Sequence, residues 1–297
     1  MKKKLDKIAK DTNTFLKGFI KKQKKSELIK PMQYGLFSGG KKIRSKVLID
    51  VGSLFNIKYK SLIIIGSAVE CIHAYSLIHD DLPCMDNDTI RRGKPSTHVK
   101  FGESTAVLAG NSLLTMAFEI LSHNELNISE KIKISLINKI SEGSGHLGVA
   151  GGQYLDLSYE HKKVSKKKII EMEIKKTGRL FSFCCMAPLI IKQKNKKEIS
   201  KFKNIGADIG LLFQVADDLI DHRGNLFIAG KKTGKDKKKG KATLISLLGQ
   251  KNTVKYADNL ILKINNKIKV YGKKSKNLSE TLNYILNRDK WKKNINF

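Results

Sequence analysis

Apolar residues recur along most of the chain at three- and four-residue steps, the spacing of an amphipathic helix, whereas alternating strand patterns and hairpin turns are sparse. This pattern predicts an all-α protein. It predicts helices over residues 5–22, 43–55, 61–81, 104–122, 129–148, 166–192, 198–221, 242–264 and 278–287. Pro31 and Pro83 lie near predicted helix ends, where a residue without an N–H is tolerated. The sequence shows no repeat of solenoid period.

The composition permits a large core and carries a strong positive charge. Of the 297 residues, 40% are hydrophobic, so length alone allows one large domain or two ordinary ones. The net charge of +31 would suit a nucleic-acid or anionic-membrane partner. However, only six of the 58 basic residues are Arg, the Lys residues are spread over the whole chain, and aromatic residues make up only 7%. A basic nucleic-acid-binding protein is therefore the alternative from another class, and we expect no nucleic-acid partner.

Cysteine usage and the apolar segments bear on the cellular compartment. The chain has four cysteines, Cys71, Cys84, Cys184 and Cys185. They form no CxxC pair and are expected to be buried thiols in a reducing compartment. The basic start MKKKLDKIAK is followed by no apolar run of signal-peptide length. The most apolar stretch, 62–79, is interrupted by Glu70, His73 and His79, so we expect a soluble cytoplasmic protein without stable membrane insertion.

Aspartates are scarce in this chain, and nearly half of them gather in two short segments. Seven of the 15 lie in HDDLPCMDND and FQVADDLID, as Asp80, Asp81, Asp86, Asp88, Asp217, Asp218 and Asp221. On a helix Asp217 and Asp221 share one face, where a divalent cation would remove their repulsion. A straight helix would turn Asp80 and Asp86 about 120° apart, so their convergence requires the helix to end or bend near Pro83. Oxygen ligands in such small numbers suit Mg²⁺ that completes its shell with water and substrate phosphate.

Cations suited to a phosphate lie near these acids. Arg91 and Arg92 follow the first cluster, and GGKKIRS supplies Lys41 and Arg44 beside a Gly pair that lets backbone N–H groups approach an anion. Three of the six arginines are in these two places, where a planar fork can bind phosphate in bidentate fashion. His73 precedes the first cluster by two helical turns and lies on nearly the same face.

The Lys- and Gly-rich segment 230–241 is expected to be a mobile loop. It superficially resembles a nucleotide phosphate loop, but five residues separate Gly234 from Gly240, and Ala242 replaces the Ser or Thr that would bind Mg²⁺. Flexible lysines that close over an anionic ligand fit the segment better.

Six spaced blocks resemble those of the short-chain trans-polyprenyl diphosphate synthases. The string ECIHAYSLIHDDLPCMDNDTIRRGKPSTHVKFGE is similar to the family's first aspartate-rich region, and FQVADDLID to its second. GGKKIR, GGQYLDL, KKTGRL and the segment 230–243 resemble the remaining blocks, in the family's order, so that the likeness spans about 30–290. Within the family the bacterial farnesyl diphosphate synthases are most similar. The resemblance implies an isoprenoid synthase-type orthogonal helical bundle around a central cavity, one domain over residues 1–297, and a homodimer.

The resemblance also assigns roles to individual residues. It implies that six aspartates hold about three Mg²⁺ ions, or Mn²⁺ in their place, against an allylic diphosphate. These are Asp80, Asp81, Asp86, Asp217, Asp218 and Asp221. The cations that would clamp this diphosphate are Arg91, Lys176, Lys231 and Lys241. The side chains that would hold isopentenyl diphosphate are Lys41, Arg44, His73 and Arg92. Thr177 and Gln214 would lie along the allylic chain, where their oxygens stabilise developing positive charge. The implied catalytic set is Asp80, Asp81, Asp86, Arg91, Lys176, Thr177, Gln214, Asp217 and Lys231.

The implied reaction is the condensation of isopentenyl diphosphate with dimethylallyl or geranyl diphosphate to give farnesyl diphosphate. Mg²⁺ and the cations neutralise the departing diphosphate, the C–O bond ionises, and the isopentenyl double bond attacks the allylic cation. Geranyl or geranylgeranyl diphosphate synthesis is the alternative within the family. A terpene cyclase of the same fold would have no need of the second diphosphate pocket. Tyr75, five positions before Asp80, and Ser76 are the candidate residues that limit product length.

Overall fold

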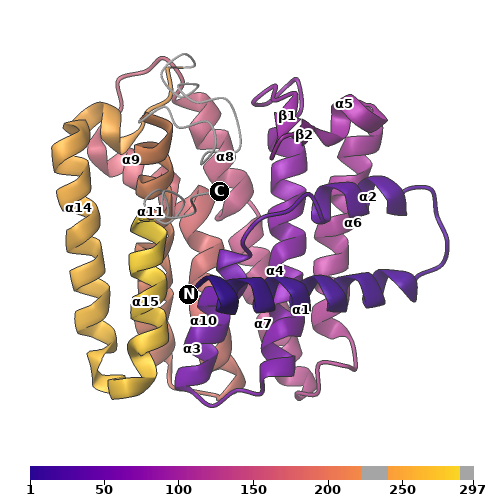
Figure 1. Cartoon of the computed structure of the whole chain (residues 1–297), viewed down its shortest axis with the longest axis horizontal. Helices are drawn as coiled ribbons and strands as arrows, with labels where there is room; N and C mark the ends of the chain where they lie inside the picture. The colour runs from indigo at the N-terminus through magenta and orange to yellow at the C-terminus, as the bar shows by residue number, and fades with distance from the viewer. Residues whose placement is uncertain (223–239, 288–297) are drawn as a thin grey trace.

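The computed structural model describes residues 1–222 and 240–287, and it is almost entirely helical over this part of the chain (Figure 1). The long helices are α1 (Lys2–Lys21), α3 (Ile43–Leu54), α4 (Tyr59–Asp80), α6 (Glu103–Ser122), α7 (Glu130–Ser144), α10 (Arg179–Ile191), α11 (Lys196–His222), α14 (Leu244–Ile268) and α15 (Lys276–Leu286). The shorter elements are α2 (Ile29–Leu36), α5 (Thr97–Phe101), α8 (Val149–Ser158), α9 (Lys166–Glu173), the π-helix η1 (Ile174–Gly178) and the 3₁₀-helix η2 (Lys269–Ser275). The predicted all-α class is confirmed.

The sequence pattern located the long helices within a few residues but missed several short elements. Helices α2, α5 and α8 were not predicted, and neither was the two-residue hairpin of β1 (Ile90–Arg91) and β2 (Lys94–Pro95). The predicted helix 129–148 is wrong at its end, because α7 stops at Ser144 and α8 begins at Val149. A side chain at Gly148 would place its Cβ 1.9 Å from the carbonyl oxygen of Gly143, so this connection depends on glycine.

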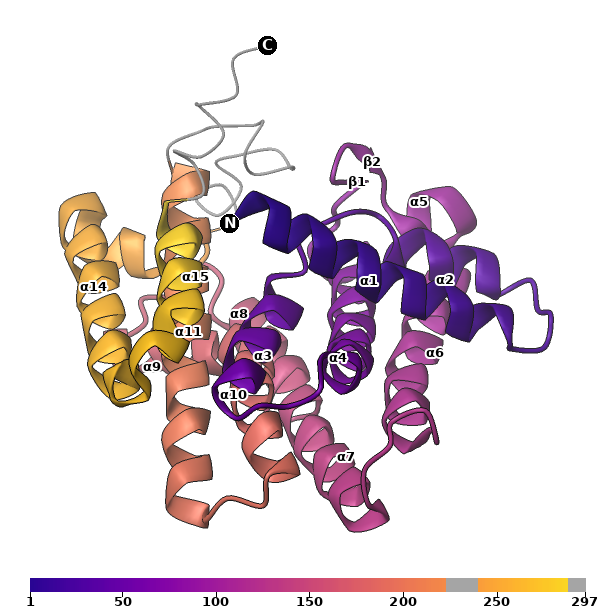
Figure 2. The same cartoon turned by 60° about the horizontal axis from the view of Figure 1, so that its bottom comes forward.

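Helix α4 forms the centre of the bundle. Every residue from 62 to 72 is buried, as expected of a helix that is apolar on all faces. It packs against α6, α3, α1 and α2, and α1 runs across it (Figures 1 and 2). Helices α10 and α11 pack on each other and complete the other half of the core, where α11 also contacts α14 and η1.

Two helices of the described part, α4 and α6, are long and apolar enough to cross a membrane. The most apolar window of α4 is 72% buried inside the protein, so its composition is that of a core helix. The corresponding window of α6 is only 44% buried, and this helix leaves Val107 and Leu108 exposed.

The four cysteines are free thiols, but they are not all buried. Cys71, Cys184 and Cys185 lie in the core, as predicted. The prediction is wrong for Cys84, which is exposed because it lies in the turn after α4 rather than on a packed helix.

Candidate active site

The first aspartate cluster lies where α4 ends and the chain reverses. The backbone amide of Asp86 donates to the carbonyl of Asp80 at 2.8 Å, and the amide of Asp88 donates to the carbonyl of Asp81 at 3.1 Å. Asn87 adopts a left-handed conformation with φ of 49°, which Asn tolerates better than most residues. The predicted helix end near Pro83 is therefore confirmed, and the reversal returns Asp86 to the end of the helix.

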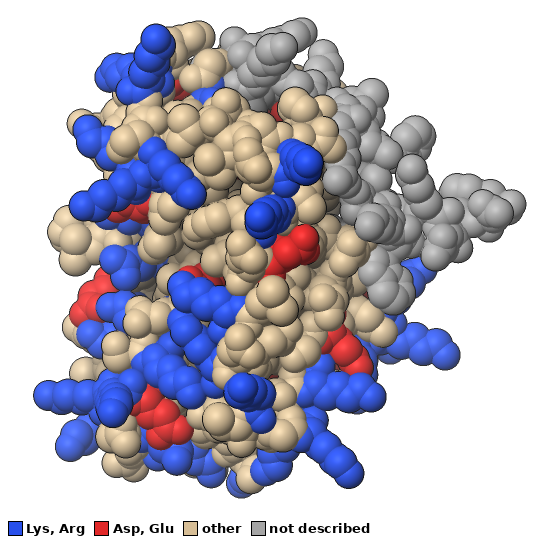
Figure 3. All heavy atoms as spheres, turned by 90° about the vertical axis from the view of Figure 1, so that its left-hand side faces the viewer, with Lys and Arg blue, Asp and Glu red and all other residues tan. Residues whose placement is uncertain are grey.

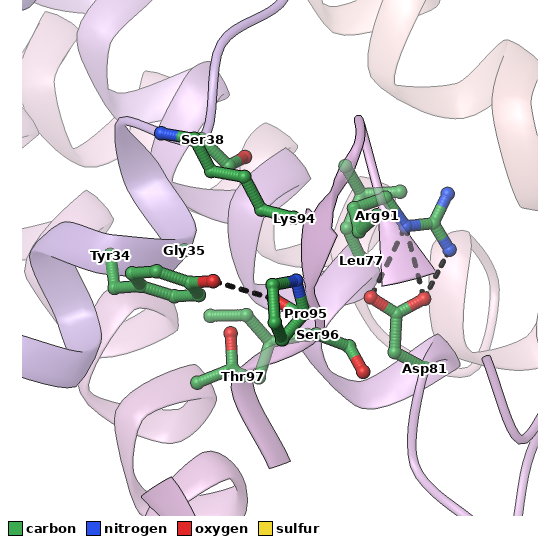
Figure 4. Close-up of a pocket in the computed structure, with 11 residues that line it drawn as sticks. Tyr34, Gly35, Ser38, Leu77, Asp81, Arg91, Lys94, Pro95, Ser96 and Thr97 are labelled. Carbon is green, nitrogen blue, oxygen red and sulfur yellow. Dashed lines mark hydrogen bonds and ion pairs between the residues drawn. The ribbon is translucent and has the colours of Figure 1, made fainter. Parts of the chain in front are cut away.

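Asp81 and Arg91 form an ion pair at this helix end. The guanidinium Nε of Arg91 donates to the two carboxylate oxygens of Asp81 at 3.0 and 3.1 Å, and Nη2 also contacts Asp81 (Figure 4). Asp88 lies 3.7 Å from Nη2. The two paired side chains line a small pocket between α2, α4 and the hairpin, where the Tyr34 hydroxyl donates to the carbonyl of Pro95 at 2.7 Å. In this structure Arg91 is thus bound to an acid of the first cluster.

Asp80 lies in an environment that disfavours its charged form. Burial raises its pKa to about 6, Lys176 opposes the shift, and the charge of Asp86 adds to it. A carboxylate that is desolvated and close to another acid gains most from a hard cation with oxygen ligands. The donor set therefore fits Mg²⁺. The described residues nevertheless bring no three His, Cys, Asp or Glu side chains together as a preassembled metal site.

The second aspartate cluster lies near the end of α11. Asp218 and Asp221 are buried and Asp217 is half-buried. The Gln214 amide Nε2 donates to Asp218 Oδ1 at 3.0 Å. The hydroxyl of Thr177 donates to Gln214 Oε1 at 3.2 Å, so a chain of hydrogen bonds joins this cluster to η1.

The π-helix η1 carries Lys176 and Thr177 and is held between two glycines. A Cβ at Gly152 of α8 would lie 2.1 Å from the backbone nitrogen of Lys176, and one at Gly210 of α11 would lie 2.3 Å from the Cα of Gly178. Both glycines thus allow neighbouring helices to approach the π-helix backbone. Single π-turns inside helices are frequent at functional sites, and this one places Lys176 and Thr177 between the two aspartate clusters.

Asp156 is a member of the site that sequence reasoning missed. Its Oδ2 accepts hydrogen bonds from Lys176 Nζ at 2.7 Å and from Lys241 Nζ at 2.6 Å. Lys241 also donates to Asp86 Oδ1 at 2.9 Å. Burial raises the pKa of Asp156, but the two lysines outweigh it and hold the pKa well below its usual value. The signal was in the sequence, because Asp156 is the acid of the GGQYLDL block and the only Asp between residues 89 and 207.

A second group of cations surrounds the start of α3. Gly39 and Gly40 have φ of 107° and 106°, and Lys42 is left-handed with φ of 49°. This turn wraps the guanidinium of Arg92, which donates to the carbonyl of Gly39. A Cβ at Gly40 would lie 2.7 Å from that guanidinium, so glycine at this position allows the close approach, and the positive φ of both residues favours glycine at each.

Three further side chains belong to this group. Arg44 and Lys41 contact aromatic rings, and His73 lies on α4. The Arg44 guanidinium lies 5.1 Å from the ring centroid of Phe181, and Lys41 Nζ lies 5.1 Å from that of Tyr284. Burial, followed by the charges of Arg44 and Arg92, lowers the pKa of His73 well below its usual value. A neutral His73 can still donate one ring N–H, and together with the surrounding cations it can bind a strongly negative group such as a diphosphate.

The two residues that were predicted to limit product length, Tyr75 and Ser76, lie on α4. The Tyr75 ring packs edge-on against His79 with centroids 5.1 Å apart, and the Ser76 hydroxyl donates to the carbonyl of His73 at 3.0 Å. Lys231 lies outside the described residues, as does the predicted loop up to residue 239.

Comparisons with known proteins agree on one family. The model described as Polyprenyl synthetase matches residues 25–284. Farnesyl diphosphate synthase of Escherichia coli (strain K12) is 38% identical to this chain over 293 residues, which are 96% of this chain and 98% of that protein. The crystal structure of an FPP/GFPP synthase from Zymomonas mobilis matches with a TM-score of 0.85 at 36% identity, covering 95% of this chain and 97% of that one. Geranyltransferase from Helicobacter pylori, crystallised with magnesium and isoprenyl diphosphate, matches with a TM-score of 0.80 at 30% identity, covering 97% of each chain.

The all-helical bundle and these comparisons define an isoprenoid synthase-type fold and a prenyltransferase, so the expected fold class and enzyme class are confirmed. The chain belongs to the polyprenyl synthetase family.

Proposed function

We propose that this protein condenses isopentenyl diphosphate with dimethylallyl and geranyl diphosphates to form farnesyl diphosphate. The observation that carries the proposal is the presence of two separate cationic groups beside α4. One contains Lys176 and Lys241 and lies beside the first aspartate cluster. The other contains Arg44 and Arg92 and lies around His73. A reaction between two diphosphate substrates requires two such places.

Six aspartates would hold the metal ions. They are Asp80, Asp81, Asp86, Asp217, Asp218 and Asp221. About three Mg²⁺ ions, or Mn²⁺ in their place, would supply electrostatic neutralisation of the allylic diphosphate. The raised pKa of Asp80, caused first by burial and then by the charge of Asp86, supports this role, because a bound cation would stabilise the ionised carboxylate against both. The geranyltransferase of Helicobacter pylori, crystallised with magnesium and isoprenyl diphosphate, supports magnesium as the ion.

The chain's own residues would prepare the allylic diphosphate to leave. Lys176, Lys241, Arg91 and Lys231 would neutralise the oxygens on which charge develops as the C–O bond ionises. Thr177 and Gln214 would turn their oxygens toward the allylic cation, and the hydrogen bond from Thr177 of η1 to Gln214 of α11, which brings the two side chains together, supports this role. The isopentenyl double bond would attack the allylic cation to form the new C–C bond, and the released diphosphate would accept the proton that the condensed cation loses as its new double bond forms.

The second cationic group would hold isopentenyl diphosphate with its double bond toward the allylic carbon. Lys41, Arg44, Arg92 and His73 are the proposed ligands. Arg44 supports this role because its guanidinium is held in place over two aromatic rings, 5.1 Å from the ring centroid of Phe181 and 5.6 Å from that of Phe213. Holding both substrates in place converts a bimolecular step into one within a complex.

We further propose a soluble cytoplasmic homodimer with one domain over residues 1–297, in which α6 lies at the interface. In a chain of net charge +31, α6 has no Lys or Arg in 20 residues. Its exposed Val107 and Leu108, and Ile134 on the neighbouring α7, therefore suit a second copy better than solvent. Elsewhere Lys and Arg are scattered among acids, as Figure 3 shows for the face that carries α14.

A product assay tests the proposed function. Purified protein is incubated with Mg²⁺, isopentenyl diphosphate and each allylic diphosphate, and product length is determined by mass spectrometry. The expected product is farnesyl diphosphate, and turnover is expected to be lost in EDTA and in Asp80→Asn. A C10 or C20 product would favour geranyl or geranylgeranyl diphosphate synthesis instead. Tight RNA binding with a steep salt dependence and no isoprenoid turnover would favour the nucleic-acid alternative.

A further inference from the structure

Glu70 is a buried carboxylate in the cationic group around α3 and α4 for which the proposed reaction has no use. It lies on α4 three residues before His73, one turn farther from the aspartate cluster. Only 3% of the residue is exposed. An isolated charge at such a depth is costly, so its partners should reveal its role.

Two neighbours from the start of α3 hold this carboxylate. Lys42 Nζ lies 3.5 Å from Glu70 Oε2, and the Lys42 side chain is itself only 6% exposed. The hydroxyl of Ser45 donates to Glu70 Oε1 at 3.1 Å. Lys42 Nζ also donates to the carbonyl of Leu36 at 3.4 Å. Lys42 is the left-handed residue that follows the Gly pair, so Glu70 ties this turn to α4.

The charge of Glu70 also acts on the proposed isopentenyl ligands. Burial lowers the pKa of Arg92, and the charge of Glu70 opposes that shift. After burial, the groups that lower the pKa of His73 most are cationic, namely Arg44, Arg92, Lys42 and Arg91. Glu70 is therefore a negative charge on the inner side of a group that is otherwise positive.

We propose that Glu70 is an internal counter-anion of the isopentenyl pocket: it stabilises the empty cationic pocket through Lys42 and opposes the binding of the substrate diphosphate. The inference rests on the proposed function of this pocket. Removing one partner of a buried ion pair leaves an uncompensated charge, which destabilises the fold. Without Glu70, the positive charge of Lys42 would have no partner until a diphosphate binds. Removal of the Glu70 charge is therefore expected to strengthen anion binding. Glu70 is thus a positioning residue that favours stability and fast release over affinity.

The first experiment replaces Glu70 by its neutral isostere. Glu70→Gln keeps an oxygen that can accept from Ser45 and removes the charge. Affinity for isopentenyl diphosphate is measured by calorimetry in EDTA, where the aspartate clusters repel the anion and the cationic pocket binds it. The expected result is a lower melting temperature together with a dissociation constant about 3- to 10-fold smaller. An unchanged or larger dissociation constant overturns the proposal, because loss of a merely structural contact would weaken binding.

A double-mutant cycle keeps the test decisive if Glu70→Gln does not fold. Lys42→Met alone leaves Glu70 uncompensated, so it is expected to bind isopentenyl diphosphate more weakly than wild type. Adding Glu70→Gln to Lys42→Met should restore the affinity to within about threefold of wild type. No gain on adding Glu70→Gln overturns the proposal.

A matched control and the wild type separate the possible failures. Glu142→Gln removes a charge of the same type from an exposed pair with Lys139 on α7, and its affinity and melting temperature should not change. If the wild type itself does not bind isopentenyl diphosphate, the proposed function fails. If the wild type binds and the Glu70 variants do not shift the affinity as stated, only the counter-anion proposal fails.

Discussion

The carboxylate of Asp156 accepts a hydrogen bond from Lys241 at 2.6 Å, across 85 residues of sequence. The same oxygen accepts from Lys176, so one buried acid holds two of the three lysines that the proposed reaction assigns to the allylic diphosphate. Two ammonium groups around one carboxylate stay close together even before a diphosphate arrives. Asp156 is therefore expected to preorganise the clamp, although it carries a charge of the same sign as the substrate.

Replacing Asp156 by Asn should impair the allylic half of the reaction. Without the carboxylate the two lysines repel each other, so we expect kcat/KM for the allylic diphosphate to fall about 10- to 100-fold. KM for isopentenyl diphosphate should change much less. The matched control is Asp208→Asn, because Asp208 pairs with Lys263 at 2.9 Å and Lys267 at 3.1 Å on a more exposed surface. Equal kinetics for the two variants would contradict a special role for Asp156.

His73 makes the stability of the substrate-free protein depend on pH. Its folded pKa is lowered below the usual value of about 6.5 by burial and then by the charges of Arg44 and Arg92. As the pH falls below about 6.5, the unfolded chain takes up a proton that the folded chain does not, so stability decreases toward lower pH. Melting temperatures between pH 5 and 8 should therefore fall less in His73→Gln than in the wild type. The same replacement at His123 is the control.

Pyrophosphate should reduce this pH dependence. An anion bound beside His73 favours the imidazolium, which brings the folded pKa back toward the unfolded one. The melting temperature of the wild type is then expected to vary with pH about as little as that of His73→Gln. If the slopes stay different at saturating pyrophosphate, the anion does not bind next to His73.

A buried polar cluster joins α3 to α15. Lys46 Nζ donates to Asp50 Oδ2 at 2.5 Å and to Thr281 Oγ1 at 3.0 Å, and the Thr281 hydroxyl donates to Asp50 Oδ2 at 2.6 Å. Thr281→Val keeps the shape and removes these hydrogen bonds, at an expected cost of about 1–3 kcal/mol in the free energy of unfolding. Asp50→Asn leaves the Lys46 charge buried without its partner and should cost about 3–5 kcal/mol. Urea unfolding measures the loss of stability in both variants. A larger loss in Thr281→Val than in Asp50→Asn would contradict the proposal that Lys46 depends on the charge of Asp50.

The long helices could be predicted because each buries an apolar face that repeats along its own sequence. The turn after α4 was only partly predictable. Pro83 indicated where the helix ends, but nothing indicated the left-handed Asn87 or the hydrogen bonds from Asp86 to Asp80 and from Asp88 to Asp81. Contacts between distant segments had no local signal at all. The pair of Asp156 and Lys241 is one example, since spacing in sequence says nothing about which helices pack together.

The same limit applies to two residues near the site. The assignment of Arg91 to the allylic diphosphate stays a prediction, and nothing in the sequence indicated the hydrogen bond that Arg91 donates to Asp81. Cys84 was predicted to be buried because free cysteines usually are, whereas its position in the turn after α4 leaves it exposed. Residue type and spacing identify the chemistry that a segment can support. The partner that each side chain contacts is decided by packing.

Product length should respond to the two candidate residues on α4 in opposite directions. Tyr75 packs against His79, whose ring Nε2 lies 3.0 Å from the carbonyl oxygen of Val107, so the Tyr75 ring is supported between α4 and α6. Removing the ring in Tyr75→Ala should lengthen the space along α4 and shift the main product from C15 toward C20. Ser76→Phe should fill space near His73 and shift it toward C10. Both are measured by chromatography of the dephosphorylated products at equal substrate conversion. Identical product lengths in the two variants would refute this placement of the cavity floor, whereas a shift in only one of them would identify which side of α4 faces the growing chain.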